Sequence, residues 1–241
     1  GKRIIYFNDF ILGVPIPING LIWMGGQHFM RKQVDQKIAQ GFSCIKLKIG
    51  GLDFGSECEV LEYIRHQYRH KNIQIRLDAN GAFSTDVALP RMRELAKFNI
   101  HSIEQPIQPG LPDMEILCRE SPIPVALDEE LIGKQTLESK LELLHHVKPQ
   151  FIILKPMLHG GLSGCKEWIE LAEKLKIDWW ITSALESAIG LNAICQFTAN
   201  YPVSIPQGLG TGTIYENNIA SPLAISGGTI FYDRNRRWDL F

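Results

Sequence analysis

The sequence predicts a single parallel (β/α) barrel of the TIM type. Apolar runs of strand length alternate with amphipathic stretches of helix length, and no long polar linker separates these units. Acidic residues end three consecutive apolar runs at Asp78, Glu104 and Asp128, with spacings of 26 and 24 residues that suit one strand plus one helix. The length of 241 residues and the hydrophobic share of 45% suit one large core. An open doubly wound sheet is the alternative, but no G-x-G-x-x-G motif follows the first strand.

Strands are expected where short apolar runs lie between turn residues. They cover residues 18–23, 43–49, 73–77, 101–103, 124–127, 151–154 and 179–182, with a weak eighth candidate at 204–206. Helices are expected between them, where apolar residues recur at helical spacing. These helices cover residues 30–40, 55–68, 84–97, 113–119, 137–145, 162–176 and 187–199. Gly41 ends the first helix, and Ser84 offers an N-cap to the third.

Two segments fall outside this repeat. Residues 1–17 are interpreted as a lead-in segment, residues 18–220 as the barrel, and residues 221–241 as a segment that leaves the barrel or returns beside it. The first residue is Gly rather than Met, which indicates a processed or incomplete start. This division predicts a barrel that sits beside a second domain.

Composition excludes several classes of partner. Lys and Arg total 25 and Asp and Glu total 26, so we expect no general attraction to nucleic acid or to an anionic membrane. No apolar run has the length of a transmembrane helix, and the N-terminus lacks the apolar core of a signal peptide. The five cysteines include no Cys-x-x-Cys pair and are interpreted as free thiols in a reducing cytoplasm.

The three acidic residues predict a metal site. The carboxyl ends of parallel strands meet at one end of a barrel, so the carboxylates of Asp78, Glu104 and Asp128 should lie together. Hard oxygen ligands suit Mg²⁺, with Mn²⁺ as a substitute, and the absence of His or Cys at these positions argues against zinc. Asn80 and Glu129 are expected in or beside the ligand shell. A single acid after a strand would more often be a helix cap or a surface residue, but three on consecutive strands favour a site.

Three lysines are expected at the same end of the barrel. Lys46 and Lys48 flank Leu47, so both side chains point to one face of their strand, and Lys155 follows a later strand across the barrel. A pair of close lysines is expected to favour the neutral amine, which can accept a proton. Lys48 is therefore predicted as a general base, with Lys46 tuning it and Lys155 acting from the opposite side. A solvated edge strand is the alternative for Lys-x-Lys. The seven histidines show no metal-ligand spacing and are expected in loops or on the surface.

These motifs carry a resemblance to a known family. The five that carry it are Lys46-Leu-Lys48, Leu77-Asp-Ala-Asn80, Ile103-Glu-Gln-Pro106, Leu127-Asp-Glu129 and Leu154-Lys-Pro156. Together they resemble the enolase superfamily in its muconate-lactonizing-enzyme-like subgroup. The stretches 182–190, 206–212 and 217–223 resemble most the o-succinylbenzoate synthase family of menaquinone biosynthesis. The resemblance runs from about residue 18 to residue 223 and implies a (β/α)7β barrel. It also implies an α+β capping domain, of which this chain would hold little.

The resemblance implies a Mg²⁺-dependent lyase that dehydrates a β-hydroxy carboxylate through an enediolate. The substrate of this lyase would be a small carboxylate. The partners of the barrel would be the capping domain and a second copy of the chain. The succinyl end of the substrate would lie against small residues after the last two strands: Ser183, Ala184, Gly208, Leu209, Gly210 and Thr211.

Two alternatives remain open on the sequence. An N-acylamino acid racemase or a dipeptide epimerase would use the same lysines and carboxylates. The dipeptide epimerases usually carry acidic residues where this chain reads Gly208-Leu-Gly-Thr. A non-catalytic barrel scaffold would be expected to lack at least one of the three carboxylates or the two facing lysines, and all five are present.

Overall fold

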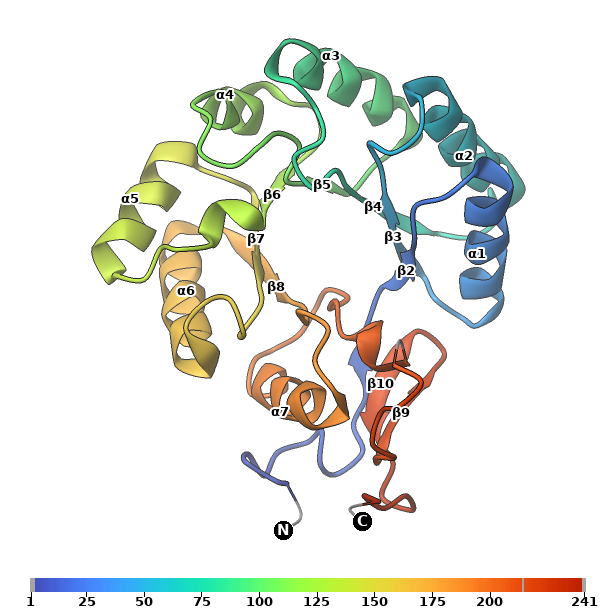
Figure 1. Ribbon diagram of the computed structural model, residues 1–241, viewed down its shortest axis with the longest axis vertical. Helices are drawn as coiled ribbons and strands as arrows, with labels where there is room; N and C mark the ends of the chain where they lie inside the picture. Colours follow the sequence, from blue (N-terminus) through green and yellow to red (C-terminus); the bar gives the residue numbers. More distant parts are fainter. Residues whose placement is uncertain (1–2, 214, 240–241) are drawn as a thin grey trace.

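The barrel prediction is confirmed by the computed structural model, which describes residues 3–213 and 215–239. A parallel sheet of seven strands curls into a ring in the order β2-β3-β4-β5-β6-β7-β8 (Figure 1). Its strands are β2 (Gly20–Ile22), β3 (Cys44–Lys48), β4 (Gln74–Asp78), β5 (Ser102–Glu104), β6 (Val125–Leu127), β7 (Phe151–Leu154) and β8 (Asp178–Ile181). Because the order in the sheet follows the order in the chain, all carboxyl ends lie at one mouth of the barrel.

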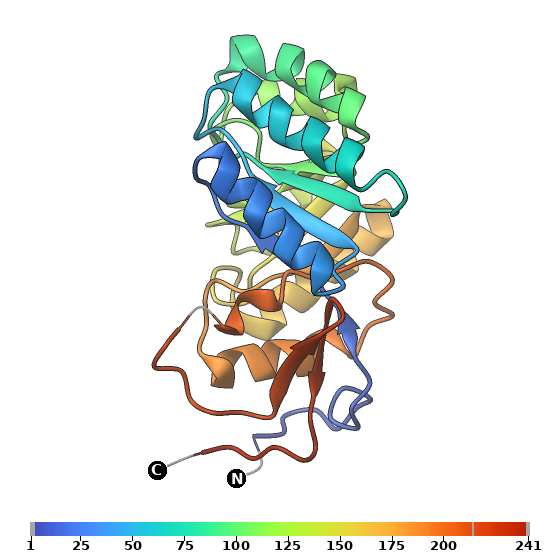
Figure 2. The ribbon, with the colours of Figure 1, turned by 90° about the vertical axis from the view of Figure 1, so that its right-hand side faces the viewer.

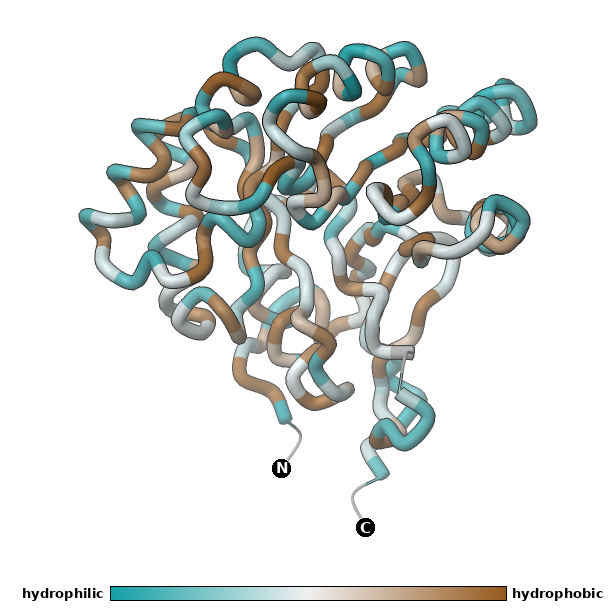
Figure 3. Tube along the Cα trace, turned by 45° about the horizontal axis from the view of Figure 1, so that its top comes forward, coloured by the Kyte–Doolittle hydropathy of each residue, from teal (hydrophilic) through white to brown (hydrophobic). Residues whose placement is uncertain are grey.

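Helices cover the outside of the ring. They are α1 (Gln27–Ala39), α2 (Phe54–Gln67), α3 (Thr85–Leu95), α4 (Asp113–Glu120), α5 (Leu137–Val147), α6 (Gly161–Leu175) and α7 (Ala188–Thr198). Short 3-10 turns are η1 (Ala96–Phe98), η2 (Glu129–Leu131) and η3 (Gly210–Thr213). Hydrophobic and hydrophilic residues alternate along these helices (Figure 3). In α6, for example, Trp168 and Ile169 are fully buried against the strands. All seven predicted helices and seven of the eight strands are thus confirmed, with ends shifted by a few residues.

The predicted eighth strand at 204–206 is wrong. The ring closes instead through isolated parallel bridges, one between Ile18 and Gln207 and one between Thr182 and Gly208. The Gln207 amide donates to Pro17 O at 2.8 Å and the Gly208 amide to Ile181 O at 2.8 Å. Pro206 has no N–H to donate to a ladder, so a regular strand cannot form over 204–206.

The two ends of the chain meet in a small second sheet. β1 (Ile16–Pro17) pairs with β10 (Thr229–Tyr232), which forms an antiparallel hairpin with β9 (Leu223–Ser226). The first and last segments that the structure describes lie on this side of the molecule, away from α2 and α3 (Figure 2). Across residues 3–213 and 215–239, every helix is too short or too polar to cross a lipid bilayer.

Candidate active site

Two lysines of β3 point into the barrel. The Lys46 ammonium lies 2.6 Å from each oxygen of Glu104 and 2.8 Å from Asp78 Oδ2. The Lys48 ammonium donates to Asp78 Oδ2 and to Asn80 Oδ1, both at 2.6 Å. The side chains of Lys46 and Lys48 are 12% and 19% exposed, so both can be reached only from the mouth of the barrel. The predicted common face of the two lysines is confirmed.

The register of the parallel sheet brings the carboxylates to the lysines. Lys48 is the ladder partner of Asp78, and Asp78 is in turn the ladder partner of Glu104. Asp128 comes directly after β6, one strand further around the ring. Asp78, Glu104 and Asp128 are all at least 98% buried, so their charges must be compensated within the site.

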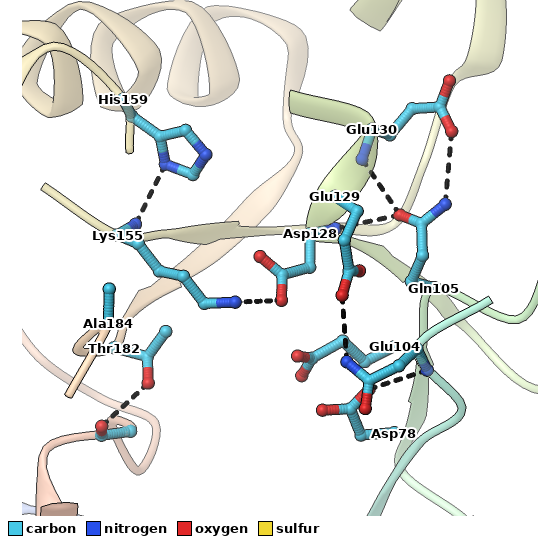
Figure 4. Close-up of polar contacts among 12 residues, drawn as sticks. Asp78, Glu104, Gln105, Asp128, Glu129, Glu130, Lys155, His159, Thr182 and Ala184 are labelled. Carbon is cyan, nitrogen blue, oxygen red and sulfur yellow. Dashed lines mark hydrogen bonds and ion pairs between the residues drawn. The ribbon is translucent and has the colours of Figure 1, made fainter. Parts of the chain in front are cut away.

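Gln105 holds the segment that carries Asp128. Its Oε1 accepts hydrogen bonds from the backbone N–H of Asp128 at 3.3 Å and of Glu130 at 3.2 Å. Its Nε2 donates to Glu130 Oε2 at 3.2 Å and to Ile107 O at 3.0 Å. In this position the Asp128 carboxylate accepts a hydrogen bond from the Lys155 ammonium (Figure 4). This contact of Gln105 could not be predicted from the sequence, because an amide that supports a loop has no motif beyond its place after Glu104.

Asn80 links the lysine side of the site to the carboxylate side. Its Oδ1 accepts from Lys48, and its Nδ2 donates to Glu129 Oε1 at 2.9 Å. Its own backbone N–H donates to Asp78 Oδ1 at 3.1 Å, and its φ of 43° is left-handed, which Asn tolerates better than most residues. Asn80 and Glu129 thus lie beside the carboxylates that are predicted to hold the metal.

The electrostatics of the cluster correct one prediction. Burial disfavours the charged form of Lys46, but the charges of Glu104 and Asp78 outweigh burial and raise the pKa of this ammonium. The expectation that two neighbouring lysines favour neutral amines is therefore wrong for Lys46, because two carboxylates contact its ammonium at 2.8 Å or less.

The two carboxylates beside Lys46 respond in opposite directions. Burial works to raise the pKa of Asp78, but Lys46 and Lys48 together lower it. Burial, followed by the charge of Asp78, raises the pKa of Glu104 well above the usual range for a carboxyl. One more cation near Glu104 would therefore stabilise its ionised form.

The carboxylates fit a divalent cation chemically but contact lysines here. Among residues 3–213 and 215–239, no three His, Cys, Asp or Glu side chains are gathered closely enough to hold a metal ion. The donor set is nevertheless hard oxygen, as Mg²⁺ requires. Asp128 Oδ1 is buried and has no hydrogen-bond partner in the described part of the chain, which leaves one lone-pair direction free for a cation.

A cavity of about 390 Å³ joins these groups at the mouth of the barrel. Lys46, Lys48, Lys155, Asp78 and Glu104 line one part of it. Five of the six residues predicted to hold the succinyl end line another part: Ser183, Ala184, Gly208, Gly210 and Thr211. Leu209 does not line the cavity, because its side chain is fully buried in the hydrophobic core, and its contact with substrate stays a prediction. A larger hollow of about 730 Å³ lies outside the barrel, between α1 and the β9–β10 hairpin, and none of the lysines or carboxylates above lines it.

Three further residues belong to this site and were not predicted. Arg76 lies against Trp180, which lines the cavity: its guanidinium stacks 4.0 Å from the centre of the Trp180 ring and donates to Pro206 O at 2.8 Å. Asn19 lines the cavity, is 5% exposed, and has no partner for its Oδ1 among the described residues. His159 accepts a hydrogen bond from the backbone N–H of Lys155 at 2.9 Å. It lies in the turn between β7 and α6, which agrees with the predicted loop position, but it is only 5% exposed.

The position of Arg76 could have been predicted from the sequence. Arg76 precedes Asp78 by two residues, so the alternation of β4 already places both on the inward face.

Known proteins are similar to this chain in sequence. A model of the enolase C-terminal domain-like family matches residues 29–235. The o-succinylbenzoate synthase of Desulfotalea psychrophila is 50% identical over 232 residues, which are 95% of this chain and 63% of that protein. The chain therefore spans less than two thirds of the length of this curated relative. The L-Ala-D/L-Glu epimerase of Bacillus subtilis is 25% identical over 174 residues, 71% of this chain and 46% of that protein.

Solved structures agree with the family model. The crystal structure of MenC from Desulfotalea psychrophila matches with a TM-score of 0.90 and 48% identity, covering 96% of this chain and 64% of that one. A substrate-liganded epimerase from Bacillus subtilis matches with a TM-score of 0.81 at 21% identity, covering 93% and 62%, which supports the fold alone. The resemblance carried by the five motifs is confirmed, and this chain belongs to the enolase C-terminal domain-like family.

Proposed function

We propose that this chain is the catalytic barrel of a Mg²⁺-dependent lyase that forms o-succinylbenzoate by dehydration. The substrate is a cyclohexadiene carboxylate with a β-hydroxyl and a succinyl side chain. The observation that carries the proposal is one cavity that Lys48 and Lys155 line together with Asp78 and Glu104. The 50% identity to an o-succinylbenzoate synthase supports this reaction over others of the superfamily.

Asp78, Glu104 and Asp128 would hold the Mg²⁺, with Asn80 and Glu129 beside them, and Mn²⁺ would substitute. The bound ion would supply a Lewis acid that stabilises negative charge on the substrate carboxylate. Lys48 shares Asp78 Oδ2 with Lys46. It would lose part of this ion pairing when the oxygen serves a metal, which would leave the Lys48 side chain available to the substrate.

Lys48 would remove the proton α to the carboxylate and return it to the β-hydroxyl, which leaves as water. The electrons of the broken C–H bond become the new ring double bond, so the ring becomes aromatic and no oxidant is required. Lys155 follows β7, across the ring from β3 in the strand order, so its ammonium would stabilise the enediolate from the opposite side. Because one lysine both takes and returns the proton, hydrogen and hydroxyl would leave from the same face of the substrate ring.

The far end of the cavity suits an anionic side chain. Ser183, Ala184, Gly208, Gly210 and Thr211 are small, so backbone amides can approach a distal carboxylate. The acidic residues that line the cavity in the described part of the chain are Asp78 and Glu104, both at the lysine end. A dipeptide epimerase needs an acidic group for the substrate ammonium, so this lining favours the succinyl substrate.

The test uses the longest form of the protein that its gene encodes. With Mg²⁺, the protein should convert the cyclohexadiene substrate to o-succinylbenzoate, followed by the loss of diene absorbance, and EDTA should stop the reaction. N-succinyl amino acids in deuterated water measure the rival racemase reaction by α-deuteration. A higher kcat/KM for racemisation than for dehydration would overturn the proposal in favour of the racemase.

A further inference from the structure

The backbone of Lys155 lies just beyond the ladder of its strand. β7 ends at Leu154, whose carbonyl accepts the last inter-strand hydrogen bond, from the Thr182 amide at 2.9 Å. Pro156 follows Lys155 and has no N–H, so the chain leaves the sheet at this point. Lys48, in contrast, lies within a ladder, opposite Asp78. The second lysine of the site is therefore held less firmly by the sheet than the first.

His159 supplies an acceptor for the backbone N–H of Lys155. Its Nδ1 accepts the Lys155 N–H at 2.9 Å, and its own backbone N–H donates to Lys155 O at 3.1 Å. Figure 4 shows the imidazole directed at the backbone nitrogen of Lys155, whose side chain extends toward Asp128. Lys155 O also accepts from the Leu158 N–H at 2.9 Å, so it is the Lys155 N–H that depends on the His159 ring.

The imidazole is itself fixed by its surroundings. Its ring meets the buried Trp168 ring edge-on at 6.5 Å between centroids. Gly164 permits the close approach of the loop, because a Cβ at that position would lie 1.9 Å from His159 O. Burial lowers the pKa of His159 to about 4, so at neutral pH the ring is uncharged and Nδ1 remains an acceptor.

The surroundings of the other ring nitrogen, Nε2, indicate that the Nδ1 contact is the reason for a histidine at position 159. Nε2 is buried and has no hydrogen-bond partner among the described residues. A buried N–H without a partner lowers stability, whereas an apolar side chain of similar size would pack without that cost. The acceptor Nδ1 is the feature that an apolar side chain cannot supply.

We propose that His159 is a positioning residue for Lys155. It fixes the backbone of the lysine where the sheet no longer does, and so directs the ammonium into the cavity. This inference rests on the role proposed for Lys155, and it assigns to His159 no contact with substrate. Small displacements of a catalytic group can lower the rate strongly, so the effect should appear in kcat rather than in substrate binding.

Two substitutions separate positioning from packing. His159→Asn keeps an acceptor, because its Oδ1 can occupy nearly the place of Nδ1, but loses the ring that packs on Trp168. His159→Leu fills much of the volume but provides no acceptor. We expect His159→Leu to lower kcat by about tenfold or more with little change in KM, and His159→Asn to stay within about threefold of wild type. His159→Asn should nevertheless have the lower Tm of the two. If kcat instead follows Tm, with His159→Asn the slower enzyme, the role of His159 is packing alone.

His101 provides a matched control. Burial also lowers its pKa to about 4, but it lies just before β5, at the amino end of the sheet, beside Phe151. His101→Leu and His101→Asn should leave kcat within about twofold of wild type. An equal loss of kcat in His101→Leu and His159→Leu would overturn the proposal.

Crystal structures of the two His159 variants give a readout that does not depend on turnover. The Lys155–Asp128 contact should persist in His159→Asn and be lost in His159→Leu. If the wild-type protein fails to dehydrate its substrate, the proposed function fails, while this comparison still decides the role of His159. An unmoved Lys155 in His159→Leu would refute the positioning role.

Discussion

Replacing Lys46 with methionine removes the cation that lies between two buried carboxylates. Asp78 and Glu104 are 0% and 2% exposed, and both contact the Lys46 ammonium at 2.8 Å or less. Methionine has a similar length and no charge, so the change removes mainly the ion pairing. Lys48 still contacts Asp78, whereas Glu104 loses its lysine contact.

The expected loss of stability follows from this geometry. Removing one partner of a buried ion pair costs about 3–5 kcal/mol, because the remaining charge stays buried without compensation. Since Lys48 still compensates Asp78, we expect the lower end, about 3 kcal/mol. For a domain of this size that corresponds to a fall in Tm of roughly 6–12 °C.

Lys97→Met is the matched control. Its ammonium also lies 2.6 Å from a carboxylate, that of Glu94, but the two side chains are 66% and 46% exposed. An exposed pair contributes about 0–1 kcal/mol, so this variant should unfold nearly as wild type does. The assay is thermal and urea unfolding at pH 7 in EDTA, which removes any bound cation. Equal losses in Lys46→Met and Lys97→Met would refute the claim that Lys46 compensates the buried charges.

The loss in Lys46→Met should shrink in acid. The pKa of Glu104 is already raised in the folded protein, by burial and by Asp78, and removing Lys46 raises it further. A carboxyl with a raised folded pKa contributes stability that is fully present below its unfolded pKa and is lost as pH rises through its folded pKa. The difference from wild type should therefore be smaller at pH 5 than at pH 8, and a larger difference at pH 5 would contradict this reasoning.

Four further predictions test other parts of the site. Lys48→Ala should abolish dehydration and leave Mg²⁺ binding, measured by calorimetry, intact; substantial residual turnover would assign the base to another lysine. Asp128→Asn should weaken Mg²⁺ binding by about tenfold or more, and unchanged affinity would exclude it as a ligand. Asn19→Leu should raise KM with kcat unchanged and should not lower Tm, because it removes a buried oxygen without a partner among the described residues; an unchanged KM would exclude substrate contact. Burial lowers the pKa of His159 to about 4, so the unfolded chain binds more protons between about pH 6.5 and 4. The free energy of unfolding should fall as pH falls through this window, less so in His159→Asn; an equal fall in both would place the titration elsewhere.

Most of the fold, and the cluster of lysines and carboxylates, could be predicted from the alternation of strands and helices and from the spacing of the charged residues. Asp78 and Glu104 could be placed from sequence because parallel strands in chain order fix their register. The same period of two placed Lys46 and Lys48 together. Local patterns suffice for these features, since each depends on one strand or on two neighbours.

Features that depend on contacts between distant parts of the chain could not be predicted from the sequence. The ring closes at Gln207 and Gly208 through two bridges, which leave no run of apolar residues to detect. Gln105 and His159 act through backbone groups of other residues, and such contacts have no sequence pattern. The raised pKa of Lys46 depends on distances to carboxylates from two other strands. The capping domain, the oligomer and the cytoplasmic location stay predictions.

The most direct test of the proposed mechanism is a crystal structure with Mg²⁺ and o-succinylbenzoate, again with the longest encoded protein. The proposed mechanism predicts one ion bound by Asp78, Glu104 and Asp128, at roughly 2.0–2.1 Å from each ligand oxygen. The aromatic ring should lie between the ammonium groups of Lys48 and Lys155, with the succinyl chain toward Gly208. An ion bound away from these three carboxylates, or a ring with both lysines on the same side, would contradict it.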